Sequence, residues 1–215
     1  SWIEVTGADG SDHSHSMDTH NVLLGQDGNI GGKTGTTDDA GYCFTSAYNR
    51  DGDEIYTVIL NSTTTDQRFT DTATLANWYY GHKVTVAIAN TQEKTANGNP
   101  LMARISQTDW TDKTIDATLA DPTAQATVFS LAGEVTEKVS YDDLSGTVHV
   151  GDKVGSITLK QDGTKIAVMD LVADEEGSGP NPIEWLLVKL DRLGRRIDNR
   201  PLMAESETVA KAPGV

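Results

Sequence analysis

The stretch that decides the fold covers residues 41–60 and reads "GYCFTSAYNRDGDEIYTVIL". Apolar and polar residues alternate over 41–49, which is typical of a strand with one covered face. Asp51 and Gly52 follow, and this dipeptide between two apolar runs predicts a tight hairpin turn. Nearly every residue over 55–60 is apolar or β-branched. We therefore expect the second strand to be covered on both faces, with helices on either side of the sheet.

The segment before this hairpin, "GGKTGTT" at residues 31–37, contains Lys33, the only lysine in residues 1–82. A phosphate-binding loop would need glycine at position 27, followed later by Gly-Lys-Thr and the start of a helix. Asp27 stands there instead, and its carboxylate would repel a phosphate. The pattern after Lys33 is that of a strand, so the sequence favours a lysine on a strand over a nucleotide site.

A helix is predicted directly after the hairpin. Thr64 and Gln67 have capping-box spacing, and apolar residues then recur at helical intervals as far as Tyr80. We expect a helix over 65–80 that packs on the hairpin. Three strands and one helix form too small a core for an independent domain. We therefore expect that this segment normally packs against further structure that it lacks here.

From Lys83 onward the chain consists of short β-type runs separated by Gly, Asn and Asp, which predicts a small sandwich or barrel. Residues 182–197 change to helical spacing, with one apolar stripe and basic residues beside it. This helix is expected to lie on a membrane surface, to dock on its own domain, or to be truncated before an anchor. Residues 1–20 predict an irregular entry, and the polar tail to Val215 is expected to be disordered.

Composition excludes some function classes. The chain has 215 residues and 37% hydrophobic content, it contains no uninterrupted apolar run long enough to span a bilayer, and its net charge of −15 argues against nucleic acid as a partner. The single cysteine, Cys43, reads as a small core residue, since no base is evident beside it. His13, His15 and His20 lack a fixed third ligand, so we favour loop histidines and expect no metal or cofactor.

Residues 21–82, including the predicted helix with its run "RFTDTATLANW", also resemble a known family. The entry "NVLL", the Lys33-Thr34-Gly35 strand, the run "DDAGYC" at 38–43 and the "RDG" turn are similar to the last third of the catalytic domain of D-alanyl-D-alanine carboxypeptidases, the low-molecular-mass penicillin-binding proteins. The segment "GTVHVGDKVGSITLKQDGTKIAVMDLVA" is more loosely similar to the β-rich domain that follows in this family.

This resemblance implies an α+β chain. Residues 1–82 would be the C-terminal part of a penicillin-binding/β-lactamase-type domain, with antiparallel strands and a helix. Residues 83–180 would be a small all-β, sandwich-like accessory domain, and 181–215 an amphipathic helix with a polar tail.

The family also implies roles for four residues. Lys33 would supply positive potential in the cleft, and Thr34 would hydrogen-bond the terminal carboxylate of the substrate. Gly35 would leave room for the substrate along the strand, and the backbone N–H of Thr36 would be an oxyanion donor. The substrate would be a peptidoglycan stem peptide ending in D-Ala-D-Ala, β-lactams would acylate the complete enzyme, and the location would be extracytoplasmic, in the cell envelope.

The departure from the family is equally specific. No Ser-x-x-Lys occurs in residues 1–215, and no Ser-x-Asn precedes Lys33. Without the nucleophile there is no covalent step, so we expect this polypeptide alone to be inactive. Because it begins with Ser1, we expect a processed or excised C-terminal portion. The alternatives are a stand-alone cell-wall binding module and a spacer above the membrane, and an uncovered sheet also predicts self-association.

Overall fold

The computed structural model describes residues 2–16 and 18–214, and the chain divides into two compact units, Ser1–His82 (unit 1) and Lys83–Val215 (unit 2). Unit 1 contains β1 (Trp2–Thr6), β2 (Asp12–Ser16), β3 (Asn29–Thr37), β4 (Gly41–Arg50), β5 (Asp53–Ser62) and α1 (Gln67–Gly81). Unit 2 contains β6 (Lys83–Ala87), β7 (Ala103–Ser106), β8 (Thr114–Leu119), β9 (Gln125–Phe129), β10 (Val135–Tyr141), β11 (Lys153–Gln161), β12 (Thr164–Ala173), α2 (Pro182–Ile197) and β13 (Glu207–Thr208). The chain is α+β, as expected, and its paired strands are mostly antiparallel.

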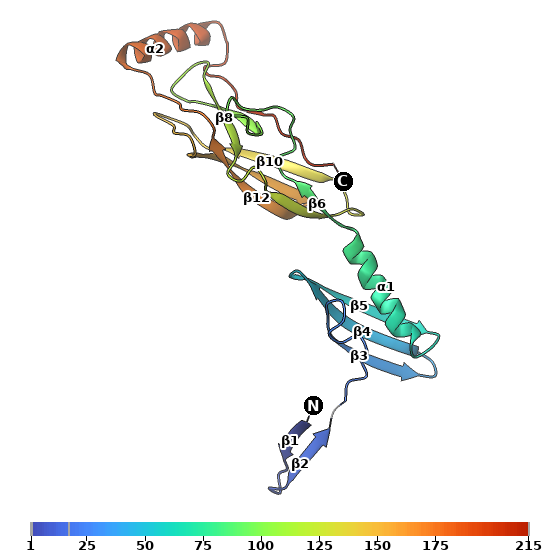
Figure 1. Ribbon diagram of the computed structural model, residues 1–215. Coiled ribbons are helices and arrows are strands. Elements are labelled where there is room, and N and C mark those ends of the chain that lie inside the picture. The colour runs from blue at the N-terminus through green and yellow to red at the C-terminus, as the bar shows by residue number, and fades with distance from the viewer. Residues whose placement is uncertain (1, 17, 215) are drawn as a thin grey trace. The chain divides into compact units, whose positions relative to one another are not determined.

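The hairpin predicted in unit 1 is present. β3, β4 and β5 form an antiparallel sheet in that order, and Figure 1 shows α1 lying along it. Asp51 and Gly52 have φ values of 53° and 86°, the left-handed pair that a two-residue hairpin turn requires. Phe44 and Tyr48 point toward α1 and are each 1% exposed. The Phe44 ring meets Phe69 of α1 edge-on at 5.0 Å, which fixes the helix on this face.

The other face of this sheet is not covered as expected. Tyr56, Val58 and Leu60 of β5 are 74%, 56% and 70% exposed, and α1 packs only on the opposite side. An apolar run on both faces of a strand indicates that both faces tolerate burial, but it does not supply the covering element. We call the face bearing Tyr56, Val58 and Leu60 the open face.

Two further expectations for unit 1 are corrected. α1 begins at Gln67 rather than near Thr65, because Thr64 accepts a hydrogen bond from the Gln67 backbone N–H (3.0 Å) in a turn that precedes the helix. The predicted irregular entry contains the β1–β2 hairpin, closed by the bond from the Gly7 N–H to the Ser11 carbonyl at 2.7 Å.

Unit 2 is a sandwich-like β domain. Its main sheet has the order β10-β11-β12-β8-β7-β13, and β6 pairs with β9 in a separate two-stranded sheet. Buried side chains from both sheets form one core. They include Ile105, Ile115, Leu119, Ala126, Val128, Ile157, Leu159 and Leu171. A further hairpin joins β11 and β12, where Asp162 and Gly163 have φ values of 48° and 75°.

The outer strands of the main sheet approach each other at one point. The Tyr141 hydroxyl, at the end of β10, lies 2.5 Å from the Thr208 hydroxyl on β13. The sheet therefore curls so that its first and last strands are linked by side chains.

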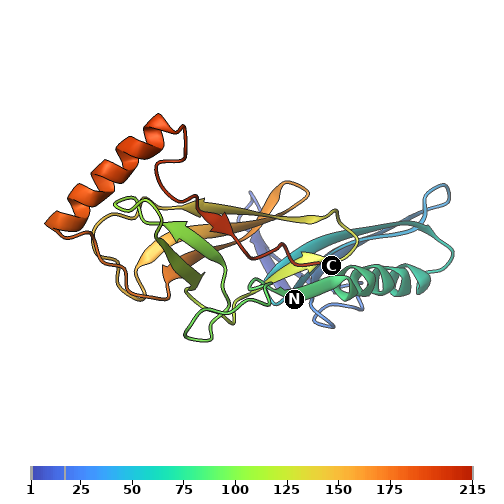
Figure 2. The ribbon, with the colours of Figure 1, turned by 90° about the horizontal axis from the view of Figure 1, so that it is seen from above.

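α2 has the predicted bounds, but the tail after it is ordered, contrary to expectation. Asn181 caps the helix by accepting from the N–H groups of Ile183 (2.9 Å) and Glu184 (3.0 Å). Beyond the helix, β13 pairs with β7, and Ala210 is 4% exposed. Figure 2 shows the segment after α2 running back along the strands of its unit. The tail is held because its backbone completes the open edge of β7.

Candidate functional site

The Lys-Thr-Gly sequence lies on an edge strand. β3 pairs only with β4 in the three-stranded sheet, so its other edge is free within the described residues. A free strand edge presents alternate backbone N–H and C=O groups to a ligand that binds in extended form. β3 runs through residues 29–37 without giving way to a helix, which excludes the phosphate-loop reading.

The four site residues predicted from the sequence lie together on β3 but project from two faces. Lys33 pairs with Thr45 and is on the open face, and its Nζ donates to the carbonyl of Thr34 at 2.6 Å. Thr34 and Thr36 pair with Phe44 and Tyr42 and project on the α1 side. The strand edge therefore has a cation on one side and two hydroxyl groups on the other.

Packing requires glycine at one position of this strand but not at another. A Cβ added to Gly32 would lie 2.6 Å from the Phe44 ring, so packing requires glycine there. A Cβ added to Gly35 would meet no atom within 4 Å, and Gly35 is not among the glycines with positive φ. Nothing in the described residues requires a glycine at position 35, which leaves open space beside the strand for a ligand.

Arg68 is a site residue that sequence reasoning missed. It lies in the first turn of α1, is 7% exposed, and its Nη1 donates to Thr36 Oγ1 at 3.3 Å. Its Nε is buried without a hydrogen-bond partner, and within the described chain no carboxylate forms an ion pair with it. Its guanidinium lies 4.8 Å from the Phe69 ring centroid. A buried cation without a carboxylate is costly, and the one side-chain hydrogen bond of this guanidinium goes to Thr36 on β3.

The third cation of unit 1 has a structural role. The Nε of Arg50 donates to the Asp27 carbonyl at 2.8 Å, its Nη2 donates to Asn77 at 2.6 Å, and its guanidinium stacks 4.5 Å from the Tyr80 ring centroid. Of the three Lys and Arg residues in residues 1–82, the two that remain, Lys33 and Arg68, both lie at the Lys-Thr-Gly strand. The scarcity of Lys and Arg in residues 1–82 was the one sequence feature that could have drawn attention to Arg68.

Cys43 and the histidines do not join this site. Cys43 pairs with Gly35, is half-buried on the open face, and donates from Sγ to the Ala40 carbonyl at 3.1 Å. His13 lies 2.8 Å from Ser11 Oγ in the β2 segment, and the side chain of His15 lies outside the described part. Across residues 2–16 and 18–214 no three potential metal ligands gather.

α2 is a second functional candidate because it docks by its polar side. Val188 is its one buried residue, and Arg192 donates from Nη2 to the backbone carbonyls of Thr108 and Trp110. The apolar stripe faces away from the domain and is 54–78% exposed. It consists of Ile183, Leu186, Leu187, Leu190, Leu193 and Ile197. The helix therefore contacts its own unit through its polar side, and its apolar stripe stays exposed.

No family model matches, and no curated protein matches. Among solved structures, a D-alanyl-D-alanine carboxypeptidase from Francisella tularensis is similar at 22% identity and a TM-score of 0.36, over 79% of this chain and 41% of that one. A peptidoglycan synthesis regulatory factor from Streptococcus pneumoniae is similar at 20% identity and a TM-score of 0.41, over 81% and 48%.

A penicillin-binding protein 5 from Haemophilus influenzae is similar at 17% identity and a TM-score of 0.36, over 68% of this chain and 42% of that one. The chain thus spans less than half the length of each of these structures. Each TM-score is below 0.5, so the activity of these proteins stays a proposal for this chain. Within the described residues, neither helix is long and apolar enough to cross a membrane.

Proposed function

We propose that this chain is the C-terminal part of a serine-type D-alanyl-D-alanine carboxypeptidase of the cell envelope, which trims peptidoglycan stem peptides through an acyl-enzyme. The observation that carries the proposal is the free edge of β3. Lys33 lies on the face where Gly35 leaves open space, Thr34 and Thr36 lie on the other face, and Arg68, which has no carboxylate partner, donates to Thr36. Such an edge suits an extended peptide that ends in a carboxylate.

Each residue then has a physical task. Lys33 raises the positive potential on the open face, and the Thr34 hydroxyl donates to the terminal carboxylate of the peptide. The backbone N–H of Thr36 is aimed at negative charge that develops on the scissile carbonyl oxygen, which is a strong contribution in acyl transfer. Arg68 adds a buried positive charge to the carboxylate end and fixes the Thr36 side chain.

The sequence lacks the serine that such a reaction needs, so the polypeptide of 215 residues alone is predicted to give neither hydrolysis nor a penicillin adduct. The test uses membranes of the native source, labelled with fluorescent penicillin and probed on the same gel with antibody against this chain. A labelled band well above 23.1 kDa that also reacts with the antibody is expected. An unlabelled antibody band near 23.1 kDa, with none larger, would overturn the enzyme proposal.

The second candidate, a binding module without catalysis, is favoured by one observation: Lys33, Thr34 and Thr36 all lie on the edge strand β3 of this chain. It predicts that the purified polypeptide binds a peptide ending in D-Ala-D-Ala and that Lys33→Ala removes the binding. Lys165→Ala, which removes an exposed lysine from β12, is the matched control. Binding by the isolated chain, together with the absence of a larger penicillin-labelled band, would select the module over the enzyme.

The outward apolar stripe of α2 supports a membrane-surface contact for unit 2. A helix with one apolar face and basic residues on its flanks lies in the plane of the interface. We expect purified protein to co-sediment with phospholipid vesicles and Leu186→Ser/Leu190→Ser to release it. Val150→Ser/Val168→Ser replaces two exposed apolar residues elsewhere in unit 2 and is expected to leave the binding unchanged.

A further inference from the structure

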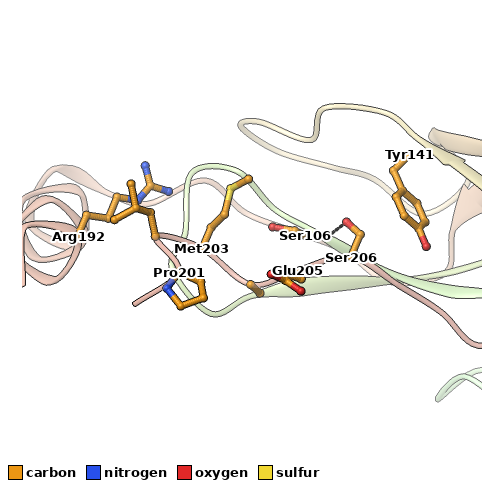
Figure 3. A pocket seen from close by; sticks show the side chains of 9 residues that line it. Ser106, Tyr141, Arg192, Pro201, Met203, Glu205 and Ser206 are labelled. Carbon is orange, nitrogen blue, oxygen red and sulfur yellow. Dashed lines mark hydrogen bonds between the residues drawn. The ribbon is translucent and has the colours of Figure 1, made fainter. Parts of the chain in front are cut away.

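A pocket of about 620 Å³ opens in unit 2 where the tail diverges from strand β7. The backbone ladder between β7 and β13 stops at Glu207, and beyond it the N–H of Ser106 donates to the side-chain hydroxyl of Ser206 at 3.0 Å. Figure 3 shows Arg192 at one end of this pocket, Ser106 and Ser206 in its middle and Tyr141 at its other end. We call it the tail pocket. Its lining consists of Ser106, Tyr141, Arg192 and residues 201–206.

Arg192 supplies the positive charge of the tail pocket. Its Nη2 donates to the carbonyls of Thr108 and Trp110, while its Nε is buried without a hydrogen-bond partner. Within the described residues Arg192 forms no ion pair, although Glu205 lines the same pocket. A guanidinium that is anchored by neutral carbonyls keeps its full charge, and its planar fork matches a carboxylate. This end of the pocket therefore suits the carboxylate of a ligand.

The middle of the tail pocket has hydrogen-bonding groups that the fold leaves unused. Among the described residues, no backbone N–H from Leu202 to Glu205 donates to another backbone group. Ser106 is 6% exposed, and its Oγ has no hydrogen-bond partner. A buried hydroxyl without a partner is costly, and a bound ligand can remove that cost. An extended peptide fits such a wall because its N–H and C=O groups alternate along its length.

The rest of the lining is apolar and adaptable. Leu202 and Met203 are 37% and 42% exposed. Figure 3 shows Met203 between Arg192 and Ser106, so a side chain bound next to the carboxylate would contact its thioether. Methionine has several rotatable bonds and a polarisable sulfur, and it therefore fits apolar partners of different shape. The pocket thus combines a cation, free backbone groups and an apolar surface.

We propose that the tail pocket binds the C-terminal end of an extended peptide whose last residue is apolar. Arg192 pairs with the terminal carboxylate, the backbone of 202–205 bonds to the peptide backbone, and Met203 contacts the last side chain. The site lies in unit 2 and is separate from the β3 edge of unit 1. The proposal therefore rests neither on the carboxypeptidase activity nor on the membrane contact of α2.

The experiment titrates the full chain, labelled with ¹⁵N, with acetyl-Ala-Ala-Leu and follows the amide chemical shifts. We expect shifts at residues 202–206, with a Kd on the order of 1 mM for a ligand of this size. The matched ligand is the same peptide with a C-terminal amide, which lacks the negative charge. It should bind about tenfold more weakly, because a charge-assisted hydrogen bond is lost.

Three variants test the pocket itself. Met203→Asp places a carboxylate beside the bound one and should weaken binding of the acid about tenfold by repulsion of like charges. Leu131→Asp adds the same charge at an exposed apolar position in the turn after β9 and should leave the affinity unchanged. Ser106→Ala should weaken binding about fivefold without lowering the unfolding midpoint, since the removed hydroxyl has no partner in the fold.

Several outcomes would overturn the proposal. Equal affinity for the acid and the amide would exclude carboxylate recognition, and equal losses in Met203→Asp and Leu131→Asp would reduce it to overall charge. Shifts confined to β3, or no shifts at about tenfold the expected Kd, would remove the site from the tail pocket. Acetyl-leucine tests the length of the ligand: if it binds as tightly as the tripeptide, the pocket takes a small carboxylate and the peptide proposal is wrong. None of these readouts depends on penicillin labelling or on vesicles.

Discussion

Arg50 and Arg68 lie in the same unit and illustrate two uses of a cation in a small domain. Arg50 closes the sheet against α1 through two hydrogen bonds and an aromatic ring. Arg68 is more deeply buried but has one long hydrogen bond and an unsatisfied Nε. The burial of a cation with so few polar partners agrees with the ligand-binding role that we propose for Arg68.

The contrast gives a prediction. Arg68→Met should leave the midpoint of thermal unfolding unchanged or higher, because replacing an unpaired buried charge by an apolar side chain removes a desolvation cost. It should weaken binding of a D-Ala-D-Ala peptide about tenfold, roughly the 1.5 kcal/mol of a charge-assisted hydrogen bond. Thermal denaturation and calorimetric titration measure the two effects.

Arg50→Met is the matched control for this variant. It should lower stability by about 1–2 kcal/mol through its lost hydrogen bonds and leave peptide affinity unchanged. A clear loss of stability in Arg68→Met would instead assign that arginine to the fold.

Glu137 on β10 supports a prediction of pH dependence. Burial raises the pKa of its carboxyl, and its Oε2 has no hydrogen-bond partner. A raised pKa means that the folded state disfavours the charged form, so this group destabilises the fold above its folded pKa and the penalty disappears as the pH falls. Glu137→Gln should therefore raise the unfolding midpoint at pH 7 but not at about pH 4. A gain of equal size at both pH values would contradict the electrostatic cause.

At the scale of elements, the hairpins and α2 were predictable because their signals are local. The Asp51-Gly52 and Asp162-Gly163 pairs supply their own left-handed turns, and α2 begins and ends where its periodicity does. The short strands β7, β8 and β10 were not individually predicted, since their pairing depends on distant partners. The burial of Arg68 was not predictable either, because it depends on how α1 packs against β3, and sequence periodicity does not report that packing.

The start of α2 can be tested on its own. Asn181→Ala removes both side-chain bonds to the first turn and should cost about 1 kcal/mol of local stability. Hydrogen exchange of the amides of residues 183–186 is expected to speed up by about fivefold. Asn181→Asp retains the acceptor and should retain the protection. Fast exchange in both variants would show that the amide nitrogen, and not the cap oxygen, matters.

At the scale of the whole molecule, the sequence anticipated two kinds of architecture along the chain but not what covers each surface. Patterning reports which faces are apolar, and the open face of unit 1 and the outward stripe of α2 are both apolar without a cover in the described residues. The ordered tail was missed because one short strand with polar side chains is held through its backbone.

The open face predicts self-association of this chain. Tyr56, Val58 and Leu60 lie side by side on β5 and are more than half exposed, a surface that a monomer rarely leaves bare. Sedimentation equilibrium should detect dimers of the wild type at tens of micromolar. Tyr56→Ser/Leu60→Ser should shift the equilibrium to monomer without lowering the unfolding midpoint, because both side chains are already in solvent. A wild-type protein that is monomeric at that concentration would contradict the prediction.

The return of the tail to the sheet has a mechanical consequence. β12, β8, β7 and β13 alternate in direction, so the chain leaves β12 toward α2 and re-enters β13 at the same end of the sheet. A tensile force on α2 therefore divides between two strands that are separated by β7 and β8, and it acts along both strand axes. Peeling β13 alone would not detach the helix, because β12 still carries load through its ladders with β8 and β11.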